Sequence, residues 1–296
     1  MKRILLLLAL TVTTFTVQAQ ESFSFSKADE YTFGKVLKED LLQSDYALPA
    51  TSDAVVLDEY VRIMPSMLDI EAYINRGRLS PMIIREVIAR KIKVLTDKGV
   101  ENRKITIPLK YKSSTDCENS ETYSVRAYSY TLKNNKVVRK VLKPSSITRR
   151  EFADGSACLE LDIPNVKKGS IIEYGYTKAI ITSSLSYERT MKESLPKLNS
   201  RYMIVLNEQH SDWFEIEALN ATNVANNKMN FDYQHSYGAD TERATNHQRA
   251  ASGWSGPNGG IRNTHNDKFV TKMYECPNPA AIDAGAGVKV VIKSDL

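Results

Sequence analysis

Alternation of apolar and polar residues recurs along most of the chain and predicts a succession of β-strands. The clearest instance is residues 159–176, where one alternating run covers 159–163 and a second covers 171–176. The connector between them, residues 164–169, contains Pro, Asn and Gly, which are turn-forming residues. The pattern predicts two half-buried strands joined by a tight loop, as in a β-hairpin.

Similar runs predict further strands on both sides of this stretch. They are 54–57 with 60–63 as a first hairpin, 67–78 as a strand and turn, 105–111, 123–132, 137–142, 202–206, 213–218, 269–274 and 288–292. Asn134 and Asn135 predict a hairpin turn, because asparagine tolerates positive φ. The Asp154-Gly155-Ser156 sequence predicts another turn, directly before residue 159.

Two segments show helical spacing instead. Apolar residues recur every three to four positions between Gly34 and Gln43, which predicts a short amphipathic helix there. Residues 82–95 also fit a helical stripe, although this segment is rich in β-branched residues and part of it fits an alternating face. The pattern by itself favours a helix over 82–95.

Residues 237–268 differ from the rest of the chain. They are rich in Gly, Asn, Ser, Thr and charged residues, and we expect a long loop. The other segments are mostly strands, without internal repeats or a Pro/Ser-rich linker. The expected fold is all-β, mainly an antiparallel β-sandwich with one short N-terminal helix, formed by a single large domain over 20–296.

The first nineteen residues have the pattern of a secretory signal peptide. Lys2 and Arg3 precede a short apolar run, and Val17-Gln18-Ala19 matches a small-residue cleavage site. A membrane anchor would need about 20 predominantly apolar residues, and the run from Ile4 to Val17 is shorter and contains threonines. We expect cleavage after Ala19, export to the periplasm or the cell exterior, and no transmembrane segment in the mature chain.

Charge and composition narrow the function classes. The full chain has a net charge of +5, and removal of Lys2 and Arg3 with the signal lowers it further. No basic stripe indicates nucleic-acid binding. The 15 tyrosines and the frequent Val, Ile and Thr runs agree with β-structure. No motif in the chain predicts a cofactor.

The three cysteines, Cys117, Cys158 and Cys276, leave the redox state open. Export permits a disulfide, and an odd number leaves one thiol over. Cys117 and Cys158 are the favoured pair because both fall near expected strand ends. Buried free thiols are an equally good interpretation.

Several segments in order resemble a known family. They are 33–36, 53–57, 90–95, 105–108, 125–130 and 163–174. Together they are similar to the domain of unknown function found at the start of secreted bacterial proteins that carry a transglutaminase-like domain. The resemblance implies a mainly antiparallel β-fold, a strand over 82–95, and no catalytic residues in this domain. In such relatives the chemistry belongs to a papain-like Cys-His-Asp core that follows, and this chain ends at Leu296, about where that core would begin. The resemblance therefore implies a stand-alone or shortened form.

Cys276 is the candidate nucleophile. A catalytic thiol needs a nearby histidine or helix start to lower its pKa, but prolines follow Cys276 closely and no histidine follows it. A packed or disulfide-bonded cysteine is the favoured interpretation. His235, His247 and His265 are too far apart from one another and from Cys276 to match short zinc-ligand spacings, and no metal site is predicted.

Trp254 and Trp213 are the candidate binding residues. Trp254 is a lone large aromatic residue on a glycine-flanked loop, and Trp213 can add a stacking surface for a glycan or peptide. The leading hypothesis is an exported, non-catalytic β-sandwich module that binds or supports a protein, peptide or polysaccharide at the bacterial cell envelope. The alternatives are a cysteine-dependent transglutaminase- or protease-like enzyme using Cys276, and a structural subunit of a split transglutaminase-like protein.

Overall fold

The computed structural model describes residues 31–46, 52–67, 82–110, 119–182, 184–236, 262–276 and 285–293. By its internal contacts the chain divides into two units, 22–233 with 265–296 and 1–21 with 234–264. Only the ends of two strands are described in the second unit, so the fold below is that of the first. The expected signal peptide lies outside the described residues, and the single domain over 20–296 stays a prediction.

An eight-stranded sheet forms the larger layer, in the spatial order β12–β13–β10–β1–β2–β8–β4–β5. Its strands are β1 (Ala54–Met67), β2 (Met82–Val94), β4 (Asn119–Lys133), β5 (Lys136–Val141), β8 (Ile171–Thr182), β10 (Ser200–Asn207), β12 (Thr222–Ser236) and β13 (Arg262–Cys276). β1 and β10 pair in parallel, whereas β1–β2, β2–β8, β8–β4, β4–β5 and β10–β13 are antiparallel.

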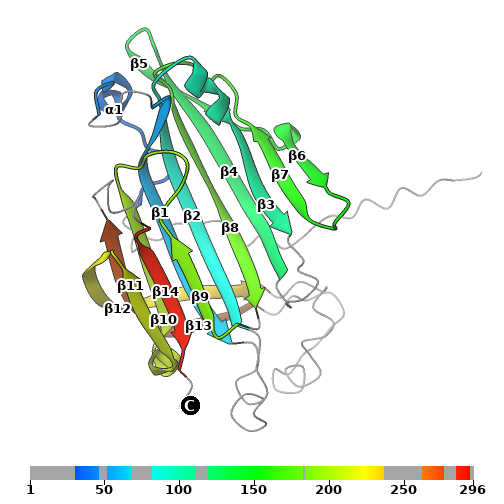
Figure 1. Ribbon diagram of the computed structural model, residues 1–296, viewed down its shortest axis with the longest axis vertical. Coiled ribbons are helices and arrows are strands. Elements are labelled where there is room, and N and C mark those ends of the chain that lie inside the picture. Colours follow the sequence, from blue (N-terminus) through cyan, green and yellow to red (C-terminus); the bar gives the residue numbers. More distant parts are fainter. Residues whose placement is uncertain are drawn as a thin grey trace, which may run out of the picture. The chain divides into compact units, whose positions relative to one another are not determined.

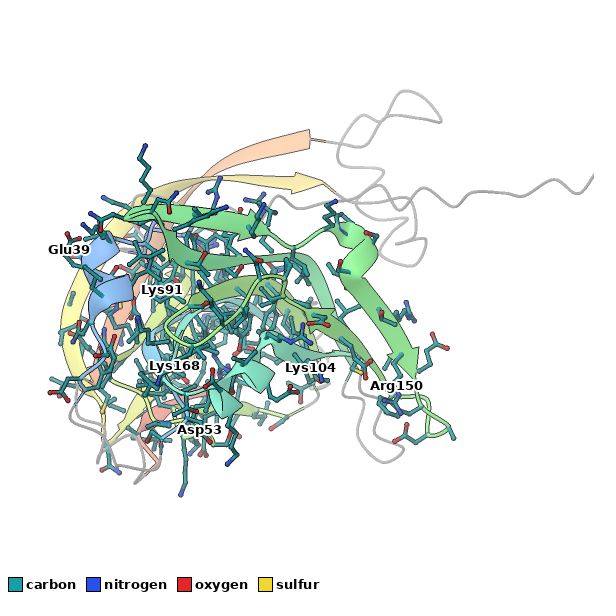
Figure 2. All side chains as sticks on the ribbon, turned by 90° about the horizontal axis from the view of Figure 1, so that it is seen from above. Glu39, Asp53, Lys91, Lys104, Arg150 and Lys168 are labelled. Carbon is teal, nitrogen blue, oxygen red and sulfur yellow. The ribbon has the colours of Figure 1, made fainter. Side chains whose placement is uncertain are left out.

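Two three-stranded sheets form the second layer. One has the order β11–β14–β9 and the other β3–β7–β6. Their strands are β11 (Phe214–Leu219), β14 (Gly287–Ile292), β9 (Ser186–Thr190), β3 (Lys104–Lys110), β7 (Ala157–Asp162) and β6 (Ile147–Glu151). Figure 1 shows β9, β14 and β11 in front of β1, β2 and β10. In the view from above, β6 (marked by Arg150) lies at the opposite end from α1 (marked by Glu39) (Figure 2).

Two hydrophobic clusters join the layers. One places Val61, Ile88 and Ile204 of the large sheet against Val288 and Val290 of β14. The other brings side chains of β1, β2, β4 and β8 against those of β3 and β7, and it includes Ile92, Ile107, Ala127, Leu161 and Ile172. Burial of alternate residues from facing sheets is what an aligned sandwich core requires. The prediction of an all-β, mainly antiparallel sandwich with a short N-terminal helix is confirmed.

The stretch 159–176 folds into two strands and a tight connector, but the strands are not a hairpin. β7 pairs with β3 and β6, whereas β8 pairs with β2 and β4. The connector passes from one layer to the other, with positive φ at Asn165 and Gly169. It is attached to β2, because Val94 O accepts from Gly169 N and Val94 N donates to Ser170 O. Alternation identifies a strand but does not say which strand it pairs with.

Two other expectations about strands are resolved by the large sheet. The periodicity favoured a helix over 82–95, which is wrong, because Met82–Val94 is strand β2, buried between β1 and β8. The expected hairpin at 54–63 is also wrong, because β1 runs without a turn and has only an irregularity between Val56 and Asp58. A central strand covered on both faces loses simple alternation, which explains the helical appearance of 82–95.

The remaining elements differ mainly in their bounds. The N-terminal helix is α1 (Lys38–Leu42), shorter than expected, and the described part of the chain also contains the 3₁₀ turns η2 (Lys98–Arg103), η3 (Pro144–Ser146) and η4 (Glu208–Trp213). The expected loop over 237–268 is wrong for its last residues, because β13 begins at Arg262. Residues 237–261 lie outside the described ranges. The Asn134-Asn135 turn is confirmed, with φ of 50° and 61°. None of the helices in the described part of the chain has the length and apolarity to cross a lipid bilayer.

Candidate binding pocket between the two small sheets

A row of polar side chains crosses the large sheet on the face that carries the small sheets. The pairing registers place Ser200 beside Glu59, Glu59 beside Arg90, and Arg90 beside Tyr174. The four residues belong to β10, β1, β2 and β8. Side chains that are directly opposite in neighbouring strands point to the same face, so the row is a consequence of register.

Glu59 is the centre of this row and is fully buried. Its Oε2 accepts from Arg90 Nε at 2.5 Å, and its Oε1 accepts from Lys197 Nζ at 2.8 Å and from Ser200 Oγ at 3.0 Å. Burial acts to raise the pKa of Glu59, but the positive charges of Arg90, Lys197 and Arg189 outweigh it and lower the pKa to about 2. Glu59 is therefore ionised at all physiological pH values.

Glu193 completes the ion pairs around Arg90 and Lys197. One of its carboxylate oxygens contacts Arg90 Nη1, and the other lies 3.4 Å from Lys197 Nζ. Arg90 Nη1 also donates to the Tyr174 hydroxyl at 3.1 Å. Unlike Glu59, Glu193 is about one-third exposed, so it forms the outer side of the network.

A second buried carboxylate, Glu86, ties β9 to the large sheet. It lies on β2 and accepts from the Tyr187 hydroxyl at 2.5 Å and from Arg189 Nη1 at 3.2 Å. The side chains of Tyr187 and Arg189 therefore point from β9 toward the large sheet. A buried carboxylate is stable only with such partners, and Glu86 determines where β9 can lie.

These groups line a pocket of about 440 Å³ between β3 and β9. β8 contributes Tyr174, Tyr176, Lys178 and Ile180 to its lining, and β3 contributes residues 105–108. The remaining lining residues are Arg90, Tyr187, Glu188, Arg189, Thr190, Lys192, Glu193 and Lys197. In Figure 1, β8 runs between β9 on one side and β3 on the other. The volume is in the range of small-ligand sites.

The lining of the pocket is polar and mostly cationic. It includes five Lys or Arg side chains against two glutamates, and buried Glu59 and Glu86 offset part of the excess. Lys192 is exposed, and in the described ranges of the chain it has no ion-pair partner. Burial raises the pKa of Tyr176 to about 12, so its hydroxyl stays neutral. The arrangement suits a ligand with carboxylate groups and hydrogen-bonding capacity.

The other face of the large sheet holds a different buried carboxylate, Glu173. Its oxygens accept from the Tyr130 hydroxyl at 2.7 Å, the Tyr31 hydroxyl at 3.0 Å and Gly34 N at 2.8 Å. Burial raises the pKa of Glu173, although these donors and Lys91 act in the opposite direction. Glu173 thereby holds the segment before α1 on the sheet.

Lys93 holds the same segment at α1 itself. Its ammonium group donates to the carbonyls of Leu41 at 2.7 Å, Gly169 at 3.0 Å and Asp40 at 3.1 Å. All three donors of the ammonium are thus satisfied by backbone. Because these contacts join the chain to itself, Lys93 and Glu173 have structural roles.

Of the predicted site residues that the structure describes, Cys158, Trp213 and Cys276, none lines the pocket. Cys276 is 3% exposed and belongs to the hydrophobic cluster around β14. Trp213 ends η4, packs against the same cluster and has the His210 ring 4.6 Å from its own. Cys158 is buried in β7, and its pairing with Cys117 stays a prediction because Cys117 lies outside the described residues. Trp254 also lies outside them.

The absence of a metal site at His235, His247 and His265 stays a prediction, because the side chains of these residues lie outside the described part of the chain. His247 lies outside the described residues, and His235 and His265 lie on β12 and β13. Where the structure describes the chain, no group of three or more His, Cys, Asp or Glu side chains is placed to hold a metal ion.

Sequence reasoning missed Glu59, Glu86, Arg90 and Arg189. A signal for three of them was present, since Glu59, Glu86 and Arg90 are among the charged residues that interrupt the apolar runs of β1 and β2. Charged residues are almost never buried unless they are paired. Which partners they have depends on sheet order and register.

No family model matches the chain, and no curated protein matches it. Among solved structures, it is similar to a protein of Parabacteroides distasonis provisionally described as a protease, with 10% identity and a TM-score of 0.43. It is also similar to a protein of Legionella pneumophila provisionally described as a nutrient-binding protein (8%, 0.32) and to an M1 zinc metallopeptidase of Deinococcus radiodurans (8%, 0.36). The matches cover 82%, 81% and 81% of this chain but 41%, 67% and 42% of those chains.

Proposed function

We propose that the chain is an exported, non-catalytic β-sandwich module that binds a partner at the bacterial cell envelope. The single observation that carries this proposal is the pocket between β3 and β9, in which buried Glu59 and Glu86 hold three of the five cationic side chains in place, namely Arg90, Lys197 and Arg189. Preorganised side chains reduce the entropic cost of binding. The signal pattern of residues 1–19 supports export.

The position of Cys276 supports a role other than catalysis. A reactive thiol requires access and a group that favours the thiolate, whereas Cys276 lies 3% exposed among apolar side chains. The pocket lining contains neither cysteine nor histidine. The binding module is therefore better supported than the cysteine-dependent enzyme.

Reversal of one charge at the pocket tests the proposal. The immobilised mature protein would be incubated with envelope extract of the source organism, and the retained protein and polysaccharide measured. We expect Lys192→Glu to lose the retained partner. Lys140→Glu, an equal change at an exposed position on β5, should keep it. Equal retention by both variants would remove the pocket from consideration.

Export is tested separately. The amino terminus of the protein purified from the periplasm and from the medium would be determined by mass spectrometry. A mature chain that begins at Gln20 supports the proposal, whereas an intact Met1 in the cytoplasm contradicts it.

A further inference from the structure

β9 is the last strand of its sheet and has an edge that β14 does not cover. Ile292 N donates to Leu185 O, and Met191 N donates to Ala286 O. Both bonds involve odd-numbered residues on the side of β9, and in an antiparallel pair hydrogen-bonded and non-hydrogen-bonded positions alternate. The backbone groups of Ser186, Glu188 and Thr190 therefore point away from β14.

Ser186 and Thr190 already use outward-pointing backbone groups in hydrogen bonds with nearby side chains. Ser186 exchanges hydrogen bonds with the Ser184 hydroxyl, and Thr190 O accepts from the Tyr202 hydroxyl at 2.9 Å. Glu188 is different, because within the described part of the chain its backbone N–H and C=O have no protein partner. One donor and one acceptor are thus available at the middle of the edge.

The free edge lies at the pocket. Tyr187, Glu188, Arg189 and Thr190 all line it, and β3 lines its other side. A strand that paired with β9 would place alternate side chains about 6.8 Å apart toward the floor of the pocket. There they would meet Arg90 and Arg189, and exposed Lys192 follows two residues after the end of β9.

We propose that the pocket binds an extended peptide segment with acidic side chains, which adds as a strand to the outer edge of β9. The peptide backbone accepts from Glu188 N and donates to Glu188 O, and its carboxylates face the cations of the pocket. This inference rests on the proposed binding function and specifies its ligand class. The peptide comes from a protein at the cell envelope.

A peptide fits the pocket better than a polysaccharide. Sugars commonly stack on exposed aromatic faces, but the three tyrosines of this pocket are only partly open, and the Tyr176 ring lies parallel to that of Tyr174 with centroids 6.5 Å apart. Tyr174 is 5% exposed with its hydroxyl bound to Arg90, and the Tyr187 hydroxyl is bound to Glu86. The outward N–H and C=O of Glu188 on a strand edge instead favour a peptide backbone as partner. The competing explanation of the charges on β9 is that they keep its open edge from pairing with other chains and aggregating. That explanation predicts no peptide binding.

Synthetic peptides test the inference on the unmodified mature protein. The probe is a fluorescein-labelled peptide that alternates four glutamates with three valines, and fluorescence anisotropy reports its binding. Two derivatives carry N-methyl groups on either the glutamate or the valine amides. Because alternate amides of a strand point to opposite edges, we expect one derivative to bind at least tenfold more weakly and the other to bind normally.

A pair of variants at one position tests the protein side. Glu188→Pro removes the outward N–H and leaves the bonds to β14, since proline is tolerated where a strand N–H faces away from its neighbour. Glu188→Ala removes the same side chain and keeps the N–H. We expect Glu188→Pro to bind the acidic peptide at least tenfold more weakly than Glu188→Ala. Thermal unfolding verifies that both variants are folded, and the methylated peptides decide the matter if the proline variant is not.

Several outcomes would overturn strand addition. They are equal binding of both methylated peptides, equal binding by the two Glu188 variants, and no binding at millimolar peptide. Displacement of the envelope partner by an acidic galacturonate oligomer, but not by the peptide, would identify a polysaccharide ligand. If Lys192→Glu loses the envelope partner and any of these results is also obtained, the peptide is rejected as the ligand. The proposed binding function of the pocket is then still supported.

Discussion

Arg90 and Glu59 lie directly opposite each other in β2 and β1, and Arg90 Nε donates to Glu59 Oε2 over 2.5 Å. Arg90 extends from there to Tyr174 on β8 and to Glu193 beside the pocket. One ion pair therefore connects the centre of the large sheet with the surface that a ligand would meet. The position of the cations in the pocket depends on a carboxylate that no ligand touches.

Glu59→Gln removes the charge that holds Arg90 and Lys197. We expect the free energy of unfolding at pH 7 to fall by about 3–5 kcal/mol, because two buried cations lose their main partner. Chemical denaturation measures the change. Glu217→Gln breaks the exposed pair with Lys289 on β11 and β14 and should have a much smaller effect. Similar losses in the two variants would contradict the role of Glu59.

Two of the buried glutamates, Glu59 and Glu173, should give opposite pH dependences of stability. Glu59 has a pKa of about 2, below its ordinary value of 4.5, so the folded state binds fewer protons and stability is lost as pH falls from about 4.5 to 2. Complete loss of the Glu59 contribution lowers the free energy of unfolding by about 3 kcal/mol. The pKa of Glu173 is raised, so its contribution is complete below 4.5 and is lost as pH rises through the higher folded value.

Carboxyl NMR titration, with assignment from Glu59→Gln and Glu173→Gln, tests these directions. The Glu173 signal should titrate above the ordinary glutamate range and the Glu59 signal below it. Two midpoints near 4.5 would show that neither environment acts as described.

Lys93→Met should release the segment around α1 from the sheet. The variant keeps most of the side-chain volume and removes three charge-assisted bonds to the carbonyls of Asp40, Leu41 and Gly169. We expect a loss of about 3 kcal/mol in stability and faster hydrogen exchange in residues 38–42. Lys35→Met, at an exposed position, is the control. Unchanged exchange in Lys93→Met would contradict the anchoring role.

Gly287→Ala should weaken the pairing of β14 with β9. A Cβ at this position would lie 2.3 Å from Arg189 O, so one of the two strands must move. We expect lower thermal stability and weaker binding at the pocket, because β9 carries Tyr187 and Arg189. Lys289→Ala on the same strand should bind normally. A fully stable Gly287→Ala protein would show that the strands adapt without cost.

Cys276→Ala should reduce stability without affecting binding. Removal of a buried sulfur from a hydrophobic cluster leaves a small cavity, which costs about 1–2 kcal/mol. The retained envelope partner and its amount should be unchanged. Thiol-dependent peptide cleavage by the unmodified protein, absent from this variant, would instead support the enzyme hypothesis.

The positions of several strands along the chain could be predicted from the sequence, because alternation and turn residues are local features. The Asn134-Asn135 turn, β4, β5, β7 and β8 follow from neighbouring residues alone. The periodicity of residues 82–95 favours a helix, whereas Met82–Val94 is a strand, because a strand at the centre of the sheet buries apolar residues on both of its faces. The resemblance to a β-domain family had indicated the strand correctly.

The sequence by itself determined the all-β class and the short N-terminal helix. It also contained the charged residues of β1 and β2, among them Glu59, Glu86 and Arg90. Only the tertiary structure decided that β7 and β8 belong to different sheets and that Glu59 faces Arg90. Local patterns specify which residues are buried, whereas the pairing of strands distant in sequence depends on the packing of the whole chain. The pocket between β3 and β9 is a product of that packing.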